Sequence, residues 1–305
     1  MRSEKDKSVS FSYSVKSEIC KETFSHRCCA IAECYGILLF CNLFSASSIR
    51  IVTEHPDFAA RVSKLFKKTF GTDFDEYPPE EPENGKFVFR IDDAEKIKKI
   101  YNTFDLVPGQ NVTHHLNRGV LEGECCDIAF VRGAFLAGGS VIDPEKRYHL
   151  EFTTTHSKIC AETYSLLLDL GFLPKDTMRN GLSVLYFKQS DQIEDILTSI
   201  GAPICAMEIM EAKVEKQMRN KINRVCNCDM ANLNKTAAAG AEQLAAIRSL
   251  RQKGVFDSLP EKLKQVAEFR EEDVNASLSE IAEKLSLSKS AVNHRMRKIM
   301  ELSKS

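Results

Sequence analysis

Two predicted helices that are apolar on almost every side constrain the fold of this chain more than any other feature. The first runs from about Cys28 to Cys41 and contains Gly36, and the second covers 127–141 and contains Gly133. A helix that is apolar all round is buried, and a glycine inside it costs about 1 kcal/mol relative to alanine. Close approach of another backbone is the usual compensation. We therefore expect each helix to pack tightly on a partner helix.

These two helices open two halves of similar order. Gly36 and Gly133 lie 97 positions apart. The expected helices are 28–41, 56–70, 92–102, 127–137, 156–170 and 190–200, and the expected strands are 48–53, 86–91, 148–153 and 182–188. A repeated order at a fixed period indicates an internal duplication. We predict repeats over about 20–105 and 120–202, with Gly36 facing Gly133 across a pseudo-twofold axis.

The C-terminal third differs from the rest of the chain in charge. Residues 212–305 contain 18 Lys and Arg against 12 Asp and Glu, a net charge of +6, whereas residues 1–211 contain 24 basic and 31 acidic residues, a net charge of −7. The strand signals also end before this third. We place a linker helix over 204–220 and an all-α domain over 221–305, in which an alanine-rich helix covers 236–254. Any contact with nucleic acid is expected in this basic third.

Two capping boxes mark helix starts near the C-terminus, Ser258-Leu-Pro-Glu261 and Ser277-Leu-Ser-Glu280. In such a box the serine side chain caps a backbone amide and the glutamate returns the bond. The helix opened by the second box ends at a short turn over 286–288, and a last helix spans 289–300. This pattern predicts a helix-turn-helix, whose second helix enters the major groove of DNA. Ser286 stands where many such turns have glycine.

Three apolar positions fit this motif: Ala282 where the helices cross, Leu287 in the turn, and Val292 as the anchor of the last helix. The residues expected to contact DNA are Lys289, Ser290, Asn293, His294, Arg295, Arg297 and Lys298. Lysine, arginine and asparagine suit the edges of guanine and adenine, and the two arginines and Lys298 could equally hold phosphates. The alternative is a plain three-helix bundle with a solvated basic face, on which His294 is only a polar surface residue.

Ahead of this domain a second basic group, Arg219, Lys221 and Arg224, could clamp a phosphate. The alternative for these three residues is a solvated linker helix.

Eleven cysteines fall as Cys28-Cys29, Cys125-Cys126, Cys226-Asn-Cys228 and single residues. None has the two-residue spacing typical of a zinc knuckle or a redox dithiol. We expect reduced thiols acting as small buried apolar groups, with no metal and no cofactor. No apolar run reaches the roughly 18–20 residues of a membrane helix, and the N-terminus lacks the apolar core of a signal peptide. We therefore expect a cytoplasmic protein without a membrane partner.

Three stretches, residues 132–152 (RGAFLAGGSVIDPEKRYHLEF), 218–236 (MRNKINRVCNCDMANLNKT) and 288–299 (SKSAVNHRMRKI), resemble the WhiA family of bacterial regulators. The leading residues 10–19 fit as well, so the resemblance covers nearly the whole chain. It implies an α+β fold, in which a degenerate LAGLIDADG homing-endonuclease-like domain of two αββαββα-type repeats occupies residues 1–203. A helix-turn-helix bundle similar to sigma-factor region four follows. The family is similar in role to transcription regulators of sporulation and cell division, and it is associated with chromosome segregation.

The same resemblance implies the loss of catalysis. In active LAGLIDADG nucleases each central helix ends in a carboxylate, and the two carboxylates hold metals that activate water and stabilise the leaving oxygen. With glycine aligned on glycine, these positions are Cys41 and Gly138, and neither offers a hard oxygen ligand. Asp143 lies nearby, but one carboxylate without a partner is a poor two-metal site. We expect no catalytic residue in this chain.

We therefore expect a non-catalytic, sequence-specific DNA-binding protein of the nucleoid that binds promoter DNA, with another transcription regulator or RNA polymerase as protein partner. In LAGLIDADG-like folds the strands form a saddle over DNA, and the candidate contacts there are Arg50, Arg90, His149 and Lys188. The acidic balance of this domain argues for a weaker role or for a protein partner. The alternatives are a partner-binding adaptor with a vestigial helix-turn-helix and a residual metal-dependent endonuclease.

Overall fold

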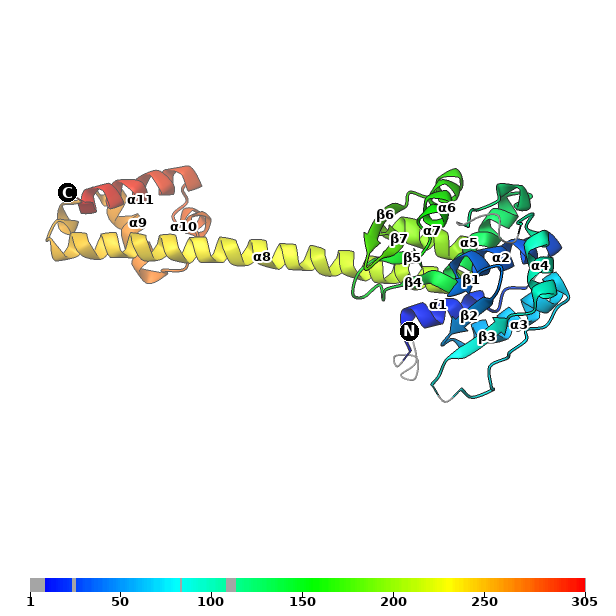
Figure 1. Cartoon of the computed structure of the whole chain (residues 1–305). Helices are drawn as coiled ribbons and strands as arrows, with labels where there is room; N and C mark the ends of the chain where they lie inside the picture. The colour runs from blue at the N-terminus through cyan, green and yellow to red at the C-terminus, as the bar shows by residue number, and fades with distance from the viewer. Residues whose placement is uncertain (1–8, 24–25, 83, 108–113, 305) are drawn as a thin grey trace. The chain divides into compact units, whose positions relative to one another are not determined.

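The computed structural model describes residues 9–23, 26–82, 84–107 and 114–304. The chain divides into two compact units, residues 1–215 and 216–305, which we call the N-terminal unit and the C-terminal unit (Figure 1). Among the described helices, none combines the length and the apolar character needed to cross a membrane.

The helices of the N-terminal unit begin and end within a few residues of the predicted positions. They are α1 (Phe11–Ile19), α2 (Arg27–Phe40), α3 (Pro56–Phe70), α4 (Ala94–Thr103), α5 (Glu124–Gly138), α6 (Ser157–Asp169) and α7 (Ser190–Ile200), with a short 3-10 helix η2 (Arg118–Val120) before α5. Local chemistry explains α3: His55 caps its first turn, Pro56 occupies its first position, and Gly71 ends it with a φ of 60°.

The described strands form two antiparallel sheets, one in each repeat. The first sheet has the order β1 (Leu43–Phe44), β2 (Ile49–Thr53), β3 (Phe87–Ile91), and the second has the order β4 (Gly139–Val141), β5 (Leu150–Thr154), β7 (Leu182–Phe187), β6 (Lys175–Arg179). Arg50 on β2 lies opposite Arg90 on β3. On β5, Leu150 and Phe152 are fully buried while Glu151 between them is partly exposed, as the two-residue period of a strand requires.

In the part of the chain that the structure describes, the first repeat has one strand fewer than the second. The second repeat follows the expected order as α5-β4-β5-α6-β6-β7-α7, whereas the described part of the first reads α2-β1-β2-α3-β3-α4. An isolated bridge between Glu76 and Arg90 stands where the missing strand would pair. Pro78, Pro79 and Pro82 follow directly, and a proline has no N–H to donate to a strand ladder. The first repeat therefore departs from the αββαββα order because of its proline-rich segment.

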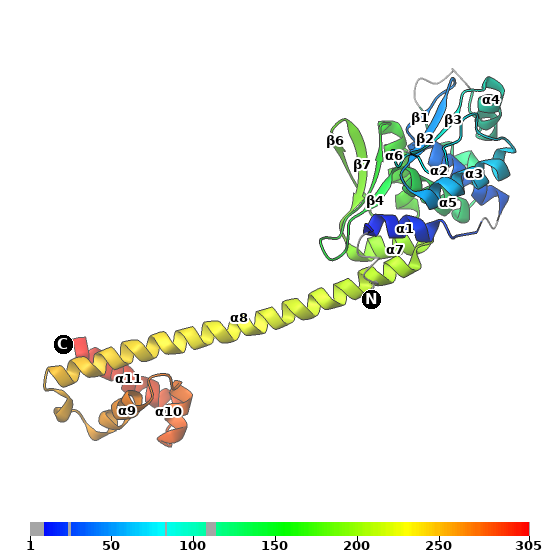
Figure 2. The ribbon, with the colours of Figure 1, turned by 90° about the horizontal axis from the view of Figure 1, so that it is seen from below.

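A tight hairpin joins β6 to β7 (Figure 2). Its turn residues, Asn180 and Gly181, have φ values of 51° and 77°, as a type I′ turn requires. We did not predict β6 from the sequence, because all five of its residues are exposed and show no apolar alternation. The Asn-Gly pair before the apolar strand β7 was the available signal.

Helices α2 and α5 pack directly on each other and bury most of their lengths. A Cβ atom on Gly36 would lie 2.1 Å from the carbonyl oxygen of Phe130, and a Cβ atom on Gly133 would lie 2.1 Å from the carbonyl oxygen of Glu33. Real Cβ atoms do not approach a backbone so closely, so both positions require glycine. The close helix pair that the duplication predicts is present.

A single helix, α8 (Pro203–Gln252), belongs to both units. From the sequence we expect a linker helix over 204–220 and a separate alanine-rich helix over 236–254. The expected interruption between these two helices is absent, because the sequence contains no residue that would end the helix there. After its first residue α8 contains no proline and one glycine, Gly240, and polar asparagines alone do not end a helix.

The two ends of α8 are buried and its middle is exposed. The first turns place Cys205, Ala206 and Ile209 in the core of the N-terminal unit. The last turns place Ile247 and Leu250 in the core of the C-terminal unit. Every residue from 217 to 235 is exposed.

The rest of the C-terminal unit is helical. After the 3-10 helix η3 (Phe256–Ser258) come α9 (Glu261–Glu272), α10 (Leu278–Lys284) and α11 (Lys289–Lys304). Its buried core includes Val266, Ile281, Val292, Met296 and Ile299. One predicted cap is wrong: Ser258 does not cap α9, because Pro260 occupies the N-cap position and the Ser258 hydroxyl instead donates to the carbonyl oxygen of Val255 at 2.7 Å.

Candidate nucleic-acid interface

The connection between α10 and α11 has the local geometry of a helix-turn-helix. Ser277 Oγ accepts the N–H of Glu280 at 3.2 Å, and the Glu280 carboxylate accepts the N–H of Ser277 at 2.6 Å, as the predicted capping box requires. The hydrogen bonds that the Ser277 backbone N–H and side chain make to the carboxylate hold the pKa of Glu280 below its usual range. Ser286 adopts a φ of 51°, in the left-handed region that favours glycine, and the next N–H, that of Leu287, donates to the carbonyl oxygen of Ala282 at 2.8 Å.

The packing residues of the motif fix the start of α11. Ala282 and Val292 are buried, and Leu287 is half-buried against the same core. Ser288 caps the helix, since its Oγ accepts the N–H of Ala291 at 3.2 Å. The position of α11 is therefore set by both core contacts and hydrogen bonds.

The exposed face of α11 carries two adjacent rows of polar side chains. Residues four apart on a helix lie on one side, so Lys289, Asn293 and Arg297 form one row, and Ser290, His294 and Lys298 form the next. All six side chains are exposed. The Lys298 Nζ atom lies 3.7 Å from the Glu301 carboxylate. We call these six residues the α11 basic face.

Arg295 does not belong to the α11 basic face. Its side chain is half-buried, and its Nη1 atom donates to the carbonyl oxygen of Lys262 at 3.3 Å. It follows Val292 by three positions and precedes Ile299 by four, so helical spacing places it beside the buried stripe. Arg295 packs α11 on α9, and this spacing was the signal that the sequence analysis passed over.

Arg219, Lys221 and Arg224 are all exposed on α8. Each residue of a helix advances by about 100°, so Lys221 and Arg224 lie about 60° apart, whereas Arg219 lies about 160° from Lys221. Lys221 and Arg224 therefore share one side of α8, and Arg219 points away from it. One phosphate clamp made by all three does not fit this helix.

One of the two basic candidates on the first sheet, Arg90, already has acidic neighbours. Arg90 lies 3.2 Å from the Asp92 carboxylate and 3.9 Å from that of Glu76, with all three side chains exposed. Arg50 lies opposite Arg90 across the strand pair and is exposed.

The second sheet repeats this arrangement around one carboxylate. His149 Nε2 lies 3.0 Å from Glu151, and Arg179 lies 2.9 Å from it. Burial opposes ionisation of Glu151, but the hydrogen bonds from His149 and Arg179 outweigh it and hold the pKa of Glu151 below its usual range. Lys188 stands over the Tyr186 ring, with Nζ 5.1 Å from the centroid. Arg179 was missed at the sequence level because its strand, β6, was missed.

The two positions that the sequence aligns with the nuclease carboxylates, Cys41 and Gly138, hold no acid. Cys41 follows the end of α2, its Sγ donates to the carbonyl oxygen of Leu38 at 3.1 Å, and burial raises its pKa to about 12, so it stays a thiol. A Cβ atom on Gly138 would lie 2.6 Å from the carbonyl oxygen of Thr153, which leaves no room for a longer side chain. The carboxylate of Asp143 accepts the N–H of Glu145 at 2.9 Å within a loop turn.

Comparison with known proteins agrees with both units. The family model of the WhiA C-terminal HTH domain matches residues 222–303, and that of the WhiA LAGLIDADG-like domain matches residues 128–219. A "probable cell division protein WhiA" from Alkaliphilus oremlandii is 36% identical, over 96% of this chain and 97% of its own length. The chain belongs to the WhiA family.

Other WhiA proteins extend this similarity. A relative with the same name from Ruminiclostridium cellulolyticum is 37% identical over 96% of this chain and 97% of its own. The crystal structure of full-length DUF199/WhiA from Thermatoga maritima covers 97% of this chain and 98% of that chain, with a TM-score of 0.59 and 24% identity, and so supports the fold. This WhiA-family chain thus combines a LAGLIDADG-like domain with a helix-turn-helix domain, and its curated relatives are named for cell division.

Proposed function

We propose that this WhiA-family protein is a non-catalytic, sequence-specific DNA-binding regulator of transcription that acts in cell division, chromosome segregation or sporulation. The observation that carries the proposal is the α11 basic face on the second helix of a helix-turn-helix. Asparagine pairs with adenine, and arginine and lysine donate to guanine, in the major groove. The net charge of +6 over residues 212–305 adds attraction to any phosphate backbone. Promoter DNA is the proposed ligand, and RNA polymerase or another regulator is the proposed protein partner.

Selection of bound fragments from genomic DNA by the full-length protein would supply an operator. Binding to that operator is then measured at several salt concentrations for Lys289→Ala, Asn293→Ala and Arg297→Ala. A lost base contact should lower the affinity by about 1–3 kcal/mol, roughly 10- to 100-fold, and relax specificity at one base pair. A lost phosphate contact should weaken binding to all sequences and reduce the salt slope by about 1.

Arg248→Ala is the matched control, because it removes one positive charge from an exposed position on α8. It should leave the affinity for the operator nearly unchanged. Unchanged affinity and an unchanged salt slope in all three folded α11 variants would remove the recognition-helix assignment. Arg295→Ala provides a second comparison: it should lower the stability of the C-terminal unit, since Arg295 bonds to α9, and change the affinity of the folded protein little.

The absence of catalysis is supported by Cys41 and Gly138, which offer no oxygen ligand at the two carboxylate positions. Incubation of the full-length protein with operator and plasmid DNA in Mg²⁺ or Mn²⁺ tests this part. We expect intact DNA. Specific cleavage that Asp143→Asn abolishes would contradict the proposal and favour an endonuclease.

A partner-binding adaptor is the second candidate, and one observation favours it for the N-terminal unit. Arg90 lies beside Asp92 and Glu76, and both His149 and Arg179 lie beside Glu151. Basic groups paired with carboxylates are less available to phosphates. A full-length triple variant, Lys289→Ala with Asn293→Ala and Arg297→Ala, separates the two roles. Normal genetic function without operator binding would favour the adaptor, whereas loss of both would favour the DNA-binding regulator.

A further inference from the structure

The N-terminal ends of α2 and α5 bring four cysteines together. Cys28 and Cys29 are the second and third residues of α2, and Cys125 and Cys126 hold the same two positions on α5. The four Sγ atoms all lie within 4.8 Å of one another. From the sequence we expect reduced thiols and no metal, because neither pair has the two-residue spacing of a zinc knuckle or a redox dithiol. Duplication and the glycine-mediated helix contact create the cluster in space.

We propose that these four cysteines bind one Zn²⁺ ion as a tetrathiolate site that links the two repeats. A tetrahedral ion with Zn–S bonds of about 2.3 Å places its sulfur atoms about 3.8 Å apart. The Sγ atoms of Cys125 and Cys126 are 4.0 Å apart, and the largest separation in the cluster is 4.8 Å. Side-chain adjustments of about 1 Å therefore complete the coordination sphere, which leaves no open position, as in structural zinc sites.

Binding of Zn²⁺ by four thiols needs no redox partner. Thiolates are the ligands of the ion, so binding forms four Zn–S bonds and releases four protons to water, with no change of oxidation state. The N-termini of two helices favour the negative charge that results.

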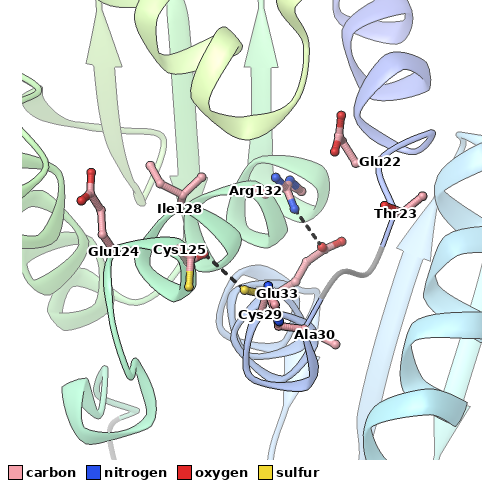
Figure 3. Close-up of a pocket in the computed structure, with 10 residues that line it drawn as sticks. Glu22, Thr23, Cys29, Ala30, Glu33, Glu124, Cys125, Ile128 and Arg132 are labelled. Carbon is pink, nitrogen blue, oxygen red and sulfur yellow. Dashed lines mark hydrogen bonds and ion pairs between the residues drawn. The ribbon is translucent and has the colours of Figure 1, made fainter.

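The cluster is also accessible. It borders a cavity of about 500 Å³ whose lining includes His26, Cys29, Glu124 and Cys125. Figure 3 shows Cys29 and Cys125 next to each other, with the Cys29 thiol 3.7 Å from the Cys125 carbonyl oxygen. Cys125 is exposed and Cys126 is buried, so an ion can enter from the solvent side and be held at the helix contact.

The geometry favours one ion over two other uses of four thiols. Disulfide formation would join the sulfur atoms in pairs at about 2.05 Å and would need an oxidant, whereas here all four lie within 4.8 Å of one another. An iron–sulfur cluster has several irons between its cysteines, and therefore needs its ligands further apart than a single ion does. Both alternatives become outcomes of the experiment.

The test uses full-length protein, reduced and stripped of metal. Titration with Co²⁺ should give the intense visible absorption of a tetrahedral cobalt tetrathiolate, saturate at one ion per chain, and be reversed by Zn²⁺. The double variant Cys28→Ser with Cys125→Ser should bind about 100-fold more weakly or not at all. The control Cys226→Ser with Cys228→Ser removes two exposed thiols from α8 and should bind like the wild type.

Cysteine alkylation followed by mass spectrometry measures the labelling rate of each thiol in the wild-type protein. This test needs no variant, so it can be made even if the double variant fails to fold. Zn²⁺ should slow labelling of Cys28, Cys29 and Cys125 at least about tenfold and leave Cys226 and Cys228 fully reactive. Equal Co²⁺ binding by the wild type and a folded Cys28/Cys125 variant would overturn the proposal. So would disulfides within the cluster after purification with reductant, or an iron–sulfur spectrum in the protein as isolated.

Discussion

Gly36 and Gly133 occupy matched positions on α2 and α5, and each lies against the backbone of the other helix. Gly36 faces the carbonyl oxygen of Phe130, and Gly133 faces that of Glu33, at the same 2.1 Å from a would-be Cβ atom. In each contact the glycine of one helix lies against a carbonyl oxygen of the other helix. A pseudo-twofold axis between parallel helices requires this equivalence. The same axis brings the two N-terminal cysteine pairs together.

Alanine at either glycine should separate the two central helices. Gly36→Ala or Gly133→Ala places a methyl group into a carbonyl oxygen that cannot rotate away, and overpacking of this kind costs about 1–3 kcal/mol or more. We expect the free energy of opening of α2 and α5 to fall by about 2 kcal/mol in each variant. Hydrogen exchange of peptides from α2 and α5 in the full-length protein measures this.

Gly123→Ala is the control for this pair. Gly123 has an extended φ of 177° and no atom within 4 Å of a would-be Cβ. It should cost less than about 1 kcal/mol, because only the weaker N-cap preference of alanine opposes it. Equal effects at all three glycines would contradict the idea of a backbone contact.

A buried ion pair lies beside the central helices. The Arg61 guanidinium donates to both carboxylate oxygens of Glu33, at 2.6 and 2.9 Å, and both side chains are at most 3% exposed. Removing Arg61 leaves the buried Glu33 carboxylate with only Arg132, 3.7 Å away, as a cationic partner. Loss of one partner of a buried ion pair costs up to about 3–5 kcal/mol. Arg61→Met should therefore unfold the N-terminal unit at a lower urea concentration, measured by circular dichroism.

The double variant Glu33→Leu with Arg61→Met tests the cause. It removes both charges, so it should be more stable than Arg61→Met alone, by about 1–3 kcal/mol, even though it carries one more substitution. A double variant that is less stable than both single variants would show that packing, and not an uncompensated charge, causes the loss.

Elements with strong local signals could be predicted from the sequence. The period of 97 residues and the apolar helices gave the duplication and the α2–α5 contact, and α7 has the predicted bounds of 190–200. Ser277-Leu-Ser-Glu280 gave a cap that is present. These predictions succeeded because each depends on spacing within one element, or on the comparison of two similar elements.

Other features depend on contacts between distant residues and left no periodic signal. The four-cysteine cluster arises only when two helices are packed together, so spacing within either pair could not reveal it. The partner of Glu33, a lone acid in an apolar helix, could be any of many basic residues until α3 was placed. Ser258 and Glu261 have the sequence spacing of a capping box, but α9 begins after Pro260, which holds its N-cap position.

His55 should make the N-terminal unit sensitive to acid. Its Nδ1 accepts the N–H of Phe58 at 3.4 Å, and its Nε2 lies 3.0 Å from the carbonyl oxygen of Tyr13 and so donates to it. This pattern needs the neutral ring, and burial lowers the pKa of His55. The contribution of His55 to stability is full above the ordinary histidine pKa of about 6.5, and it is lost as the pH falls from there towards the lower folded-state pKa.

His55→Asn keeps a side chain that can cap a helix but removes the titration. It should flatten the pH dependence of the melting temperature below pH about 6.5. His26 is the matched control, since it holds the N-cap position of α2 and makes no side-chain cap bond. His26→Asn should leave the slope as it is in the wild type, and an equal change of slope in both variants would contradict the assignment to His55.

Ser277 caps α10, whereas Ser258 only resembles a cap of α9 in the sequence. Ser277→Ala removes the bond to the N–H of Glu280 and should cost about 1 kcal/mol of the stability of α10. Ser258→Ala removes only a hydroxyl that donates to the Val255 carbonyl oxygen, so its effect on α9 should be smaller. Hydrogen exchange of peptides from α9 and α10 in the full-length protein measures both.

Because α10 supports α11, the Ser277 variant should also bind operator DNA more weakly. Glu280→Gln keeps an acceptor for the capping box and should bind nearly like the wild type. A larger loss of helix stability in Ser258→Ala than in Ser277→Ala would contradict this prediction. It would mean that the Ser-x-x-Glu sequence marks the start of α9, although the structure places that start after Pro260.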